Sequence, residues 1–214
     1  GGRFRIMNSS VDSIEERSKE LAPLLWESNC LDFGEFTLTS GKKSPYYVDL
    51  RLLPSHPEKF ARSIEMAADF LGAESKEFDA ICAVPTGGLP FGTALAQRME
   101  KPLTYVRKEG KSHGEGQKIE GEMNQGDRVL LVDDIITTGG SVISAGKSVI
   151  EAGAQVEQVA VLVDRTEGAT ENLAEEDFDL LKLANIGPVV EELKVSGRIT
   201  KETYEKVENY LSRR

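Results

Sequence analysis

The chain has 214 residues, of which 39% are hydrophobic and 29% are charged. This length predicts a single domain, large enough to bury a core without disulfides or structural metals. The formal net charge is −10. It argues against nucleic acid as a partner, because affinity for phosphate backbones depends on lysine and arginine.

Cysteine usage and hydropathy bear on the compartment. Cys30 and Cys82 are far apart, no CxxC motif is present, and Cys82 lies in an apolar run typical of a small buried side chain. This pattern favours a reducing cytoplasm over an oxidising compartment. No apolar stretch reaches the ~18 residues that a membrane span requires, so no membrane partner is expected. Residues 1–6 lack a signal-peptide pattern and are a candidate cloning remnant, with Met7 a candidate natural start.

The first part of the chain predicts two helices and a hairpin. Residues 11–28 combine a capping box with apolar residues at helical spacing. Residues 33–50 alternate apolar and polar side chains around a Ser-Gly-Lys-Lys turn, which predicts a β-hairpin. Pro57 suits the first turn of a helix that runs to about Leu71.

From residue 79 the pattern changes to alternating strands and helices. The apolar runs here do not alternate with polar residues, as is typical of strands covered on both faces. The expected elements are strands at 81–84, 103–106, 128–133 and 158–163, helices at 89–99 and 140–152, a loop at 107–126, a further strand at 178–183 and a terminal helix at 200–211. Such alternation predicts an α/β fold, with a parallel sheet flanked by helices.

The predicted organisation is one domain over residues 1–214. It consists of an N-terminal helix and hairpin hood at 7–56, an α/β core at 57–190 and a C-terminal helix at 191–214.

The segment at 129–141 carries the sharpest chemical signal. A buried strand ends in Asp133 and Asp134, and two threonines and two glycines then lead into a helix. Glycine amides at a helix start form a phosphate cradle, while the carboxylates suit ribose hydroxyls or a hydrated Mg²⁺. The segment therefore predicts a sugar-phosphate site. The alternative, an ordinary turn and helix cap, requires neither both acids nor both glycines.

Two glycine-containing segments carry weaker signals. Residues 140–148 resemble a P-loop, but five residues separate the glycines where the motif has four, so Lys147 is expected to be a solvated helix residue. Residues 83–90 form a second strand, glycine turn and helix start. This turn is either a second anion site or a plain tight turn.

A cationic, glycine-bearing stretch occupies 107–116 in this acidic chain. It contains Arg107, Lys108, Lys111 and His113. A charged glycine loop is commonly only solvated, but this one leaves the end of a strand beside the predicted cradle. Its composition favours a flap that closes over a pyrophosphate. The other histidine, His56, is expected to be a helix-entry residue.

These segments together resemble a known family. Residues 132–141 (VDDIITTGGS) resemble the phosphoribosyl pyrophosphate (PRPP) signature of type I phosphoribosyltransferases. Residues 33–47 are similar to the N-terminal hairpin of the orotate phosphoribosyltransferases, and 107–114 to their catalytic loop. Arg165, just after a predicted strand, resembles their arginine for the orotate carboxylate. The similarity runs from about residue 15 to 190, in the family's order.

The resemblance implies a Mg²⁺-dependent transfer of ribose 5-phosphate from PRPP to orotate. The homodimer that it implies has a flap that crosses to the neighbouring site. Mg²⁺ is expected on PRPP, through water near the two aspartates rather than directly on the protein. The implied catalytic residues are Lys111, His113, Asp133 and Asp134. Those implied for PRPP are Arg107, Lys108, Lys111, His113, Asp133, Asp134, Ile135, Ile136, Thr137, Thr138, Gly139, Gly140 and Ser141. Those implied for orotate are Thr137, Arg165, Tyr46 and Tyr47.

Two departures from the family pattern and two rival functions stay open. Bacterial members often carry lysines where this chain has Thr39 and Thr86, and Lys42 or Lys43 is a candidate substitute. One rival is a type I transferase for another base, such as a purine or uracil. The other is a non-catalytic nucleotide-sensing regulator of the same fold, which would not require Lys111 or His113.

Overall fold

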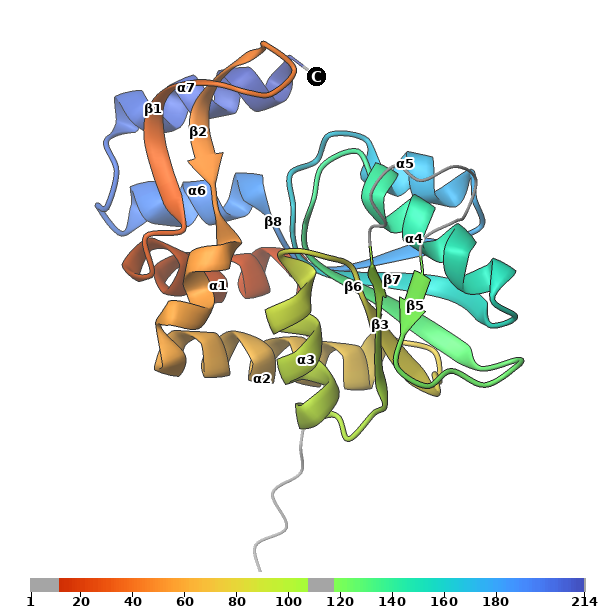
Figure 1. The fold of residues 1–214 in the computed structure, drawn as a ribbon. Coiled ribbons are helices and arrows are strands. Elements are labelled where there is room, and N and C mark those ends of the chain that lie inside the picture. The colour runs from red at the N-terminus through yellow and green to blue at the C-terminus, as the bar shows by residue number, and fades with distance from the viewer. Residues whose placement is uncertain (1–11, 108–117, 214) are drawn as a thin grey trace, which may run out of the picture.

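The structure is a computed structural model that describes residues 12–107 and 118–213. Its centre is a six-stranded sheet of order β5-β4-β3-β6-β7-β8 (Figure 1). The strands are β3 (Ala80–Ala83), β4 (Leu103–Arg107), β5 (Lys118–Glu120), β6 (Arg128–Ile136), β7 (Gln155–Asp164) and β8 (Asp179–Asn185). All neighbours pair in parallel except β4 and β5, which are antiparallel. The predicted parallel sheet flanked by helices is confirmed.

Helices cover both faces of this sheet. One apolar core contains side chains of α1 (Ile14–Glu27), α2 (Pro57–Glu74), α3 (Gly88–Arg98) and α6 (Ile186–Val195). The other lies under α4 (Gly140–Glu151) and α5 (Ala169–Ala174). The central strand β6 contributes to both, since Leu130 and Val132 belong to the first core and Leu131 to the second. Burial on both faces explains why these strands lack polar alternation.

Outside the sheet lies the expected hairpin, formed by β1 (Leu31–Thr37) and β2 (Lys43–Val48). A short 3-10 helix, η1 (Leu50–Ser55), leads from β2 into α2. The C-terminal helix α7 (Lys201–Ser212) packs against β2, so the hairpin and the last helix lie together outside the sheet (Figure 1). Helix α6 spans the boundary expected between residues 190 and 191.

Local signals account for most helix starts. Ser13 and Glu16 form the predicted capping box at α1, with Ser13 Oγ accepting from the Glu16 amide at 3.2 Å. Pro57 is in the first turn of α2, where its missing amide hydrogen costs nothing. His56 is the residue before α2, as predicted, although its side chain makes no capping hydrogen bond.

Four elements were not predicted. The 3-10 helix η1 follows the hairpin, strand β5 lies within the expected loop at 107–126, α5 has six residues, and α6 begins directly after β8. Among the described residues, none of the helices combines the length and the apolarity that crossing a bilayer requires.

Candidate active site

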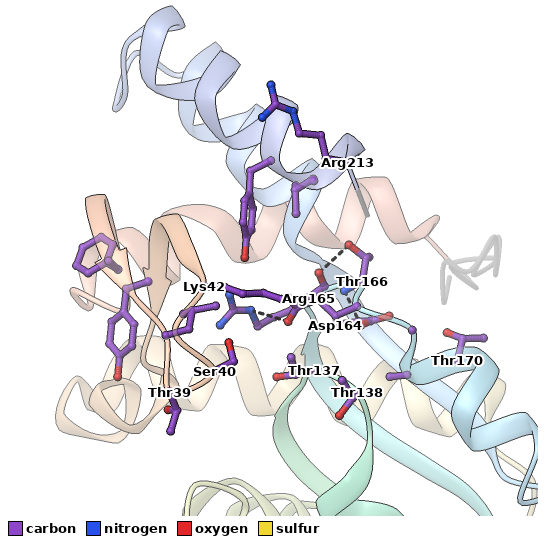
Figure 2. A pocket seen from close by; sticks show the side chains of 18 of the residues that line it. Thr39, Ser40, Lys42, Thr137, Thr138, Asp164, Arg165, Thr166, Thr170 and Arg213 are labelled. Carbon is purple, nitrogen blue, oxygen red and sulfur yellow. Dashed lines mark hydrogen bonds and ion pairs between the residues drawn. The ribbon is translucent and has the colours of Figure 1, made fainter.

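A pocket of about 1460 Å³ lies between the hairpin β1–β2, helix α7 and the carboxyl ends of β6 and β7. Thr39, Ser40 and Lys42 reach it from the hairpin side, and Thr137, Thr138 and Arg165 from the strand ends, with Arg213, directly after α7, above them (Figure 2). Ligand pockets commonly have volumes of about 300–1000 Å³, so this one has room for more than one small molecule. Parallel sheets bind their ligands at this end of the strands.

Arg165 follows β7 directly and is the most constrained cation in the pocket. Its amide donates to the Ile136 carbonyl at 3.0 Å, which ties the turn after β7 to the end of β6. The residue is 8% exposed. Its Nε lies 3.6 Å from a Glu167 carboxylate oxygen, and its guanidinium carbon lies 4.9 Å from the centre of the Tyr46 ring. The guanidinium is therefore held by an anion and an aromatic face at the wall of the pocket.

Asp164 fixes the turn that carries Arg165. Its carboxylate accepts hydrogen bonds from the Thr166 amide and from Lys182 Nζ on β8, both at 2.8 Å. Asp164 is 2% exposed, so its charge requires these partners. This pair links the end of β7 to the neighbouring strand β8.

The two tyrosines predicted for orotate lie in different environments. Tyr47 lines the pocket and is 41% exposed. Tyr46 is fully buried and does not line the pocket. Its ring packs behind Arg165 and meets Tyr210 of α7 edge to face, with the ring centres 6.0 Å apart.

The acid pair faces the turn between β3 and α3 rather than the pocket between hairpin and strand ends. Asp133 Oδ1 accepts from the Asp134 amide, and Asp134 Oδ1 from the Ile135 amide, both at 2.8 Å. A Cβ at Gly88 would lie 2.9 Å from Asp133 Oδ1, so only glycine allows this close approach. The second glycine turn predicted from the sequence therefore lies against the acid pair.

The predicted cradle follows at the start of α4. Gly139 has φ +93°, a left-handed conformation that glycine adopts without strain, and α4 begins at Gly140. The Thr138 carbonyl accepts from Asn172 Nδ2 at 2.7 Å, which ties the cradle to α5. Thr137 and Thr138 are exposed, whereas the Ile136 side chain is buried in the core. Ile136 therefore presents backbone atoms alone to this surface, and Ile135 packs against the other core.

The flap is described only at its first residue. Arg107 ends β4, and its Nε lies 3.3 Å from Glu120 on β5. Lys108, Lys111 and His113 lie outside the described residues.

The candidate replacements for the family's lysines are separated in space. Lys42 and Thr39 line the pocket. Lys43 donates from Nζ to Thr37 Oγ1 at 3.0 Å and borders a second hollow between the hairpin and α7. Thr86 is exposed in the β3–α3 turn. Of the two lysines, Lys42 is the one in the pocket.

Cys30 is buried between the end of α1 and the start of β1. Burial, with smaller contributions from Asp49 and Asp134, raises the pKa of its thiol to about 12. Burial also raises the pKa of Cys82 to about 11. Both cysteines are free, and their thiols stay protonated at neutral pH.

A protein-bound metal would require more ligands than the acid pair offers. In the part of the chain that the structure describes, no group of three His, Cys, Asp or Glu side chains is arranged to hold a metal ion. Mg²⁺ prefers six oxygen ligands and readily keeps waters or takes phosphate oxygens. Asp133 and Asp134 therefore fit a Mg²⁺ that they would hold through its bound water, with its direct ligands coming from a substrate and from water.

Several pocket residues were missed from the sequence. They are Glu167, Lys182, Tyr210 and Arg213. The pairing of Lys182 with Asp164 depends on strand order, and Tyr210 belongs to a helix whose apolar spacing indicates burial but not a partner.

Known proteins are similar to this chain in both sequence and fold. A family model described as a phosphoribosyl transferase domain matches residues 53–194, a region that ends before α7. The chain is 43% identical over 182 residues to the orotate phosphoribosyltransferase of Pyrococcus abyssi, covering 83% of this chain and 98% of that protein.

Two solved structures show the same relationship. Orotate phosphoribosyltransferase from Aeropyrum pernix is 36% identical with a TM-score of 0.76, covering 82% of this chain and 98% of that one. Leishmania donovani UMP synthase is 34% identical with a TM-score of 0.84; the match covers 94% of this chain but 43% of that longer chain. With a matching family model and relatives that are similar over nearly their full length, this chain belongs to the orotate phosphoribosyltransferases.

Proposed function

We propose that this chain transfers the ribose 5-phosphate group from PRPP to orotate, giving orotidine 5′-phosphate and pyrophosphate on the route to UMP. The observation that carries the proposal is the buried guanidinium of Arg165 at the pocket wall, held by Glu167 and the ring of Tyr46. An arginine fixed in this way suits a planar anion, because its fork of donors matches a carboxylate. Orotate is such an anion.

Base recognition is assigned to residues around Arg165. The guanidinium binds the orotate carboxylate, and exposed Thr137 lies at the end of β6 across the same pocket. Tyr47, exposed on the hairpin, covers the base from the other side. Lys42 lines the same space and is the proposed substitute for the lysine absent at Thr39.

The PRPP half of the site is assigned to residues 133–141. The amides of 138–141, at the start of α4, bind the 5′-phosphate, since the positive end of a helix favours an anion. Asp133 and Asp134 bind the ribose hydroxyls or the water shell of Mg²⁺. When bound, Mg²⁺ neutralises charge on the pyrophosphate.

The reaction is substitution at the anomeric carbon, during which positive charge develops on the sugar and pyrophosphate leaves. The protein has to stabilise the leaving group and exclude water. Arg107, Lys108, Lys111 and His113 are assigned to the pyrophosphate, from a flap that crosses to the neighbouring site of a homodimer. A cytoplasmic setting is compatible with two free, buried cysteines.

An absorbance assay tests this function. The purified chain, with PRPP and Mg²⁺, is expected to consume orotate and to release pyrophosphate in equal amounts. Uracil, adenine and hypoxanthine serve as the other bases. Turnover of one of these in place of orotate would contradict the proposal and favour a transferase for another base. PRPP binding without turnover of any base would favour a nucleotide-sensing regulator.

A further inference from the structure

The C-terminal helix α7 reaches the base pocket from outside the α/β core. Its last turn contributes Tyr210 and Leu211 to the pocket lining, and the residue after the helix, Arg213, also lines the pocket. Thr200 caps the start of the helix, with its side chain accepting from the Thr203 amide at 3.1 Å, and Val207 of the helix is 1% exposed in the core. These contacts anchor α7, so its last turn has a defined position over the pocket.

The ring of Tyr46 lies between Tyr210 and Arg165 and contacts both. Its ring meets that of Tyr46 edge to face, at an interplanar angle of 78° and 6.0 Å between centres. The face of Tyr46 in turn lies 4.9 Å from the guanidinium carbon of Arg165. Three side chains from α7, β2 and the end of β7 therefore form one continuous stack.

Tyr46 is held on its backbone side by the hairpin. Its carbonyl accepts from Ser44 Oγ at 2.8 Å, and it pairs with Phe33 in the β1–β2 ladder. These contacts fix the backbone position of Tyr46 but not the torsion angles of its side chain, which orient the ring. Because Tyr46 is fully buried, the side chains packed around it set that rotation.

We propose that Tyr210 is a positioning residue for base recognition, which sets the Tyr46 ring and through it the pose of the Arg165 guanidinium. This inference rests on the proposed function, in which Arg165 binds the orotate carboxylate. An edge-to-face pair is stabilising and directional, and a cation over an aromatic face is held in the plane that the ring defines. Through Tyr210, helix α7 thus contributes to the discrimination between a base that carries a carboxylate and one that does not.

The first experiment measures steady-state kinetics of Tyr210→Ala, Tyr210→Leu and Tyr210→Phe. Tyr210→Ala is expected to raise the orotate KM about three- to tenfold, the range that corresponds to losing one aromatic pair, with the PRPP KM changed less than about twofold. Tyr210→Phe keeps the ring, and its orotate KM is expected to equal that of the wild type. Tyr210→Leu fills the space without an aromatic edge and is expected to resemble Tyr210→Ala.

Tyr204→Ala provides the matched control on the same helix. Tyr204 packs its ring under Lys194 Nζ at 3.9 Å, and it does not line the pocket. Removing it costs α7 one tyrosine ring without touching the stack, so the orotate KM is expected to stay at the wild-type value. An equal rise in the orotate KM in Tyr204→Ala and Tyr210→Ala would overturn the proposal, because it would mean that α7 acts only through general stability.

A double variant separates positioning from direct contact with the base. If Tyr210 acts through Tyr46, the double variant of Tyr46→Leu and Tyr210→Ala is expected to have the same orotate KM as the single variant Tyr46→Leu. A further three- to tenfold rise in that background would show direct contact, and would contradict a role through Tyr46.

Arg165→Ala separates the failure of this inference from that of the proposed function. If Arg165→Ala raises the orotate KM selectively and Tyr210→Ala does not, only the role of Tyr210 is refuted. If Arg165→Ala has no selective effect, the proposed base site itself fails.

Discussion

Gly87 lies directly against Asp134. A Cβ at Gly87 would be 2.8 Å from the carboxyl carbon of Asp134, a separation that real Cβ atoms essentially never show. The two residues come from the turn after β3 and from the end of β6, which are neighbouring strands in the sheet. Two segments that the sequence marked separately, the acid pair and the second glycine turn, are thus parts of one surface.

Gly87→Ala is expected to disturb this surface. Asp134 accepts a hydrogen bond from the Ile135 amide, so its carboxylate has little freedom to move away. Overpacking of this kind commonly costs about 1–3 kcal/mol, so we expect a lower Tm together with weaker PRPP binding.

Gly72→Ala is the matched control for that variant. Gly72 lies in α2 with open space where a Cβ would be, and alanine stabilises a helix interior by roughly 0.5–1 kcal/mol over glycine. Its Tm is expected to be unchanged or raised and its activity unchanged. A Gly87→Ala variant with normal PRPP binding would contradict the close contact with Asp134.

The acid pair is expected to act on PRPP rather than on folding. Asp133→Asn combined with Asp134→Asn keeps oxygen acceptors for the two backbone amides that these side chains bind. Each lost charged contact is worth roughly 1.5–3 kcal/mol, which predicts a fall of about tenfold to a hundredfold per carboxylate in kcat/KM for PRPP. Calorimetric titration with PRPP and a thermal melt separate the two effects. Wild-type turnover in the double variant would contradict the cradle assignment.

The pair of Asp79 and Arg128 predicts a pH dependence of stability. Arg128 donates to both Asp79 carboxylate oxygens, at 2.8 Å from Nη2 and 3.0 Å from Nε, and these hydrogen bonds lower the pKa of Asp79 well below its usual value. A lowered acid pKa contributes stability in full above the unfolded pKa, about 3.9, and loses it as the pH falls toward the folded pKa.

Asp79→Asn is therefore expected to lower Tm more at pH 7 than at pH 3. Thermal melts of wild type and variant at both pH values measure this, and Asp69→Asn, on the exposed face of α2, controls for the loss of one carboxylate. The same difference in Tm at pH 7 and pH 3 would refute the role of ionised Asp79.

If the flap crosses to the neighbouring subunit, as proposed, two inactive variants are expected to complement each other. Lys111→Ala is expected to lower kcat with little change in Tm, because a cation that reaches pyrophosphate on closure stabilises the transition state more than the ground state. Lys111→Ala subunits are mixed in equal amounts with subunits that carry both Asp133→Asn and Asp134→Asn. After random exchange about half of the dimers are heterodimers, and each heterodimer has one site without either defect. Activity near a quarter of wild type is then expected. No recovery despite demonstrated subunit exchange would place flap and cradle on one chain.

Elements with a strong local pattern were predictable, whereas short or context-dependent ones were not. The apolar runs of β3, β6 and β7 and the Pro57 start of α2 specify their structure locally. Strand β5 has three residues and exists because it pairs with the edge of β4. Helix α6 does carry a signal, with buried residues at 186, 189, 190 and 193, but it follows β8 without a loop to mark its start.

The candidate site divides in the same way. The acid pair and the glycines that follow it are recognisable because an ordinary turn requires neither both acids nor both glycines, and Arg165 is recognisable from the family resemblance. Tyr210 and Lys182 are not, since each matters through a partner brought near by the fold, Tyr46 in one case and Asp164 in the other. Tyr46 was predicted as a base contact, and its burial behind Arg165 shows how sequence locates a segment without giving the direction of a side chain.

The most direct test of the base site compares two Michaelis constants in Arg165→Ala. Loss of a charge-assisted contact worth roughly 1.5–3 kcal/mol predicts an orotate KM raised about ten- to a hundredfold, with the PRPP KM nearly unchanged. Arg62→Ala, which removes an exposed arginine that pairs with Glu20 and does not line the pocket, is the matched control and is expected to behave as wild type. Equal increases in both Michaelis constants, or none in either, would contradict recognition of the orotate carboxylate by Arg165.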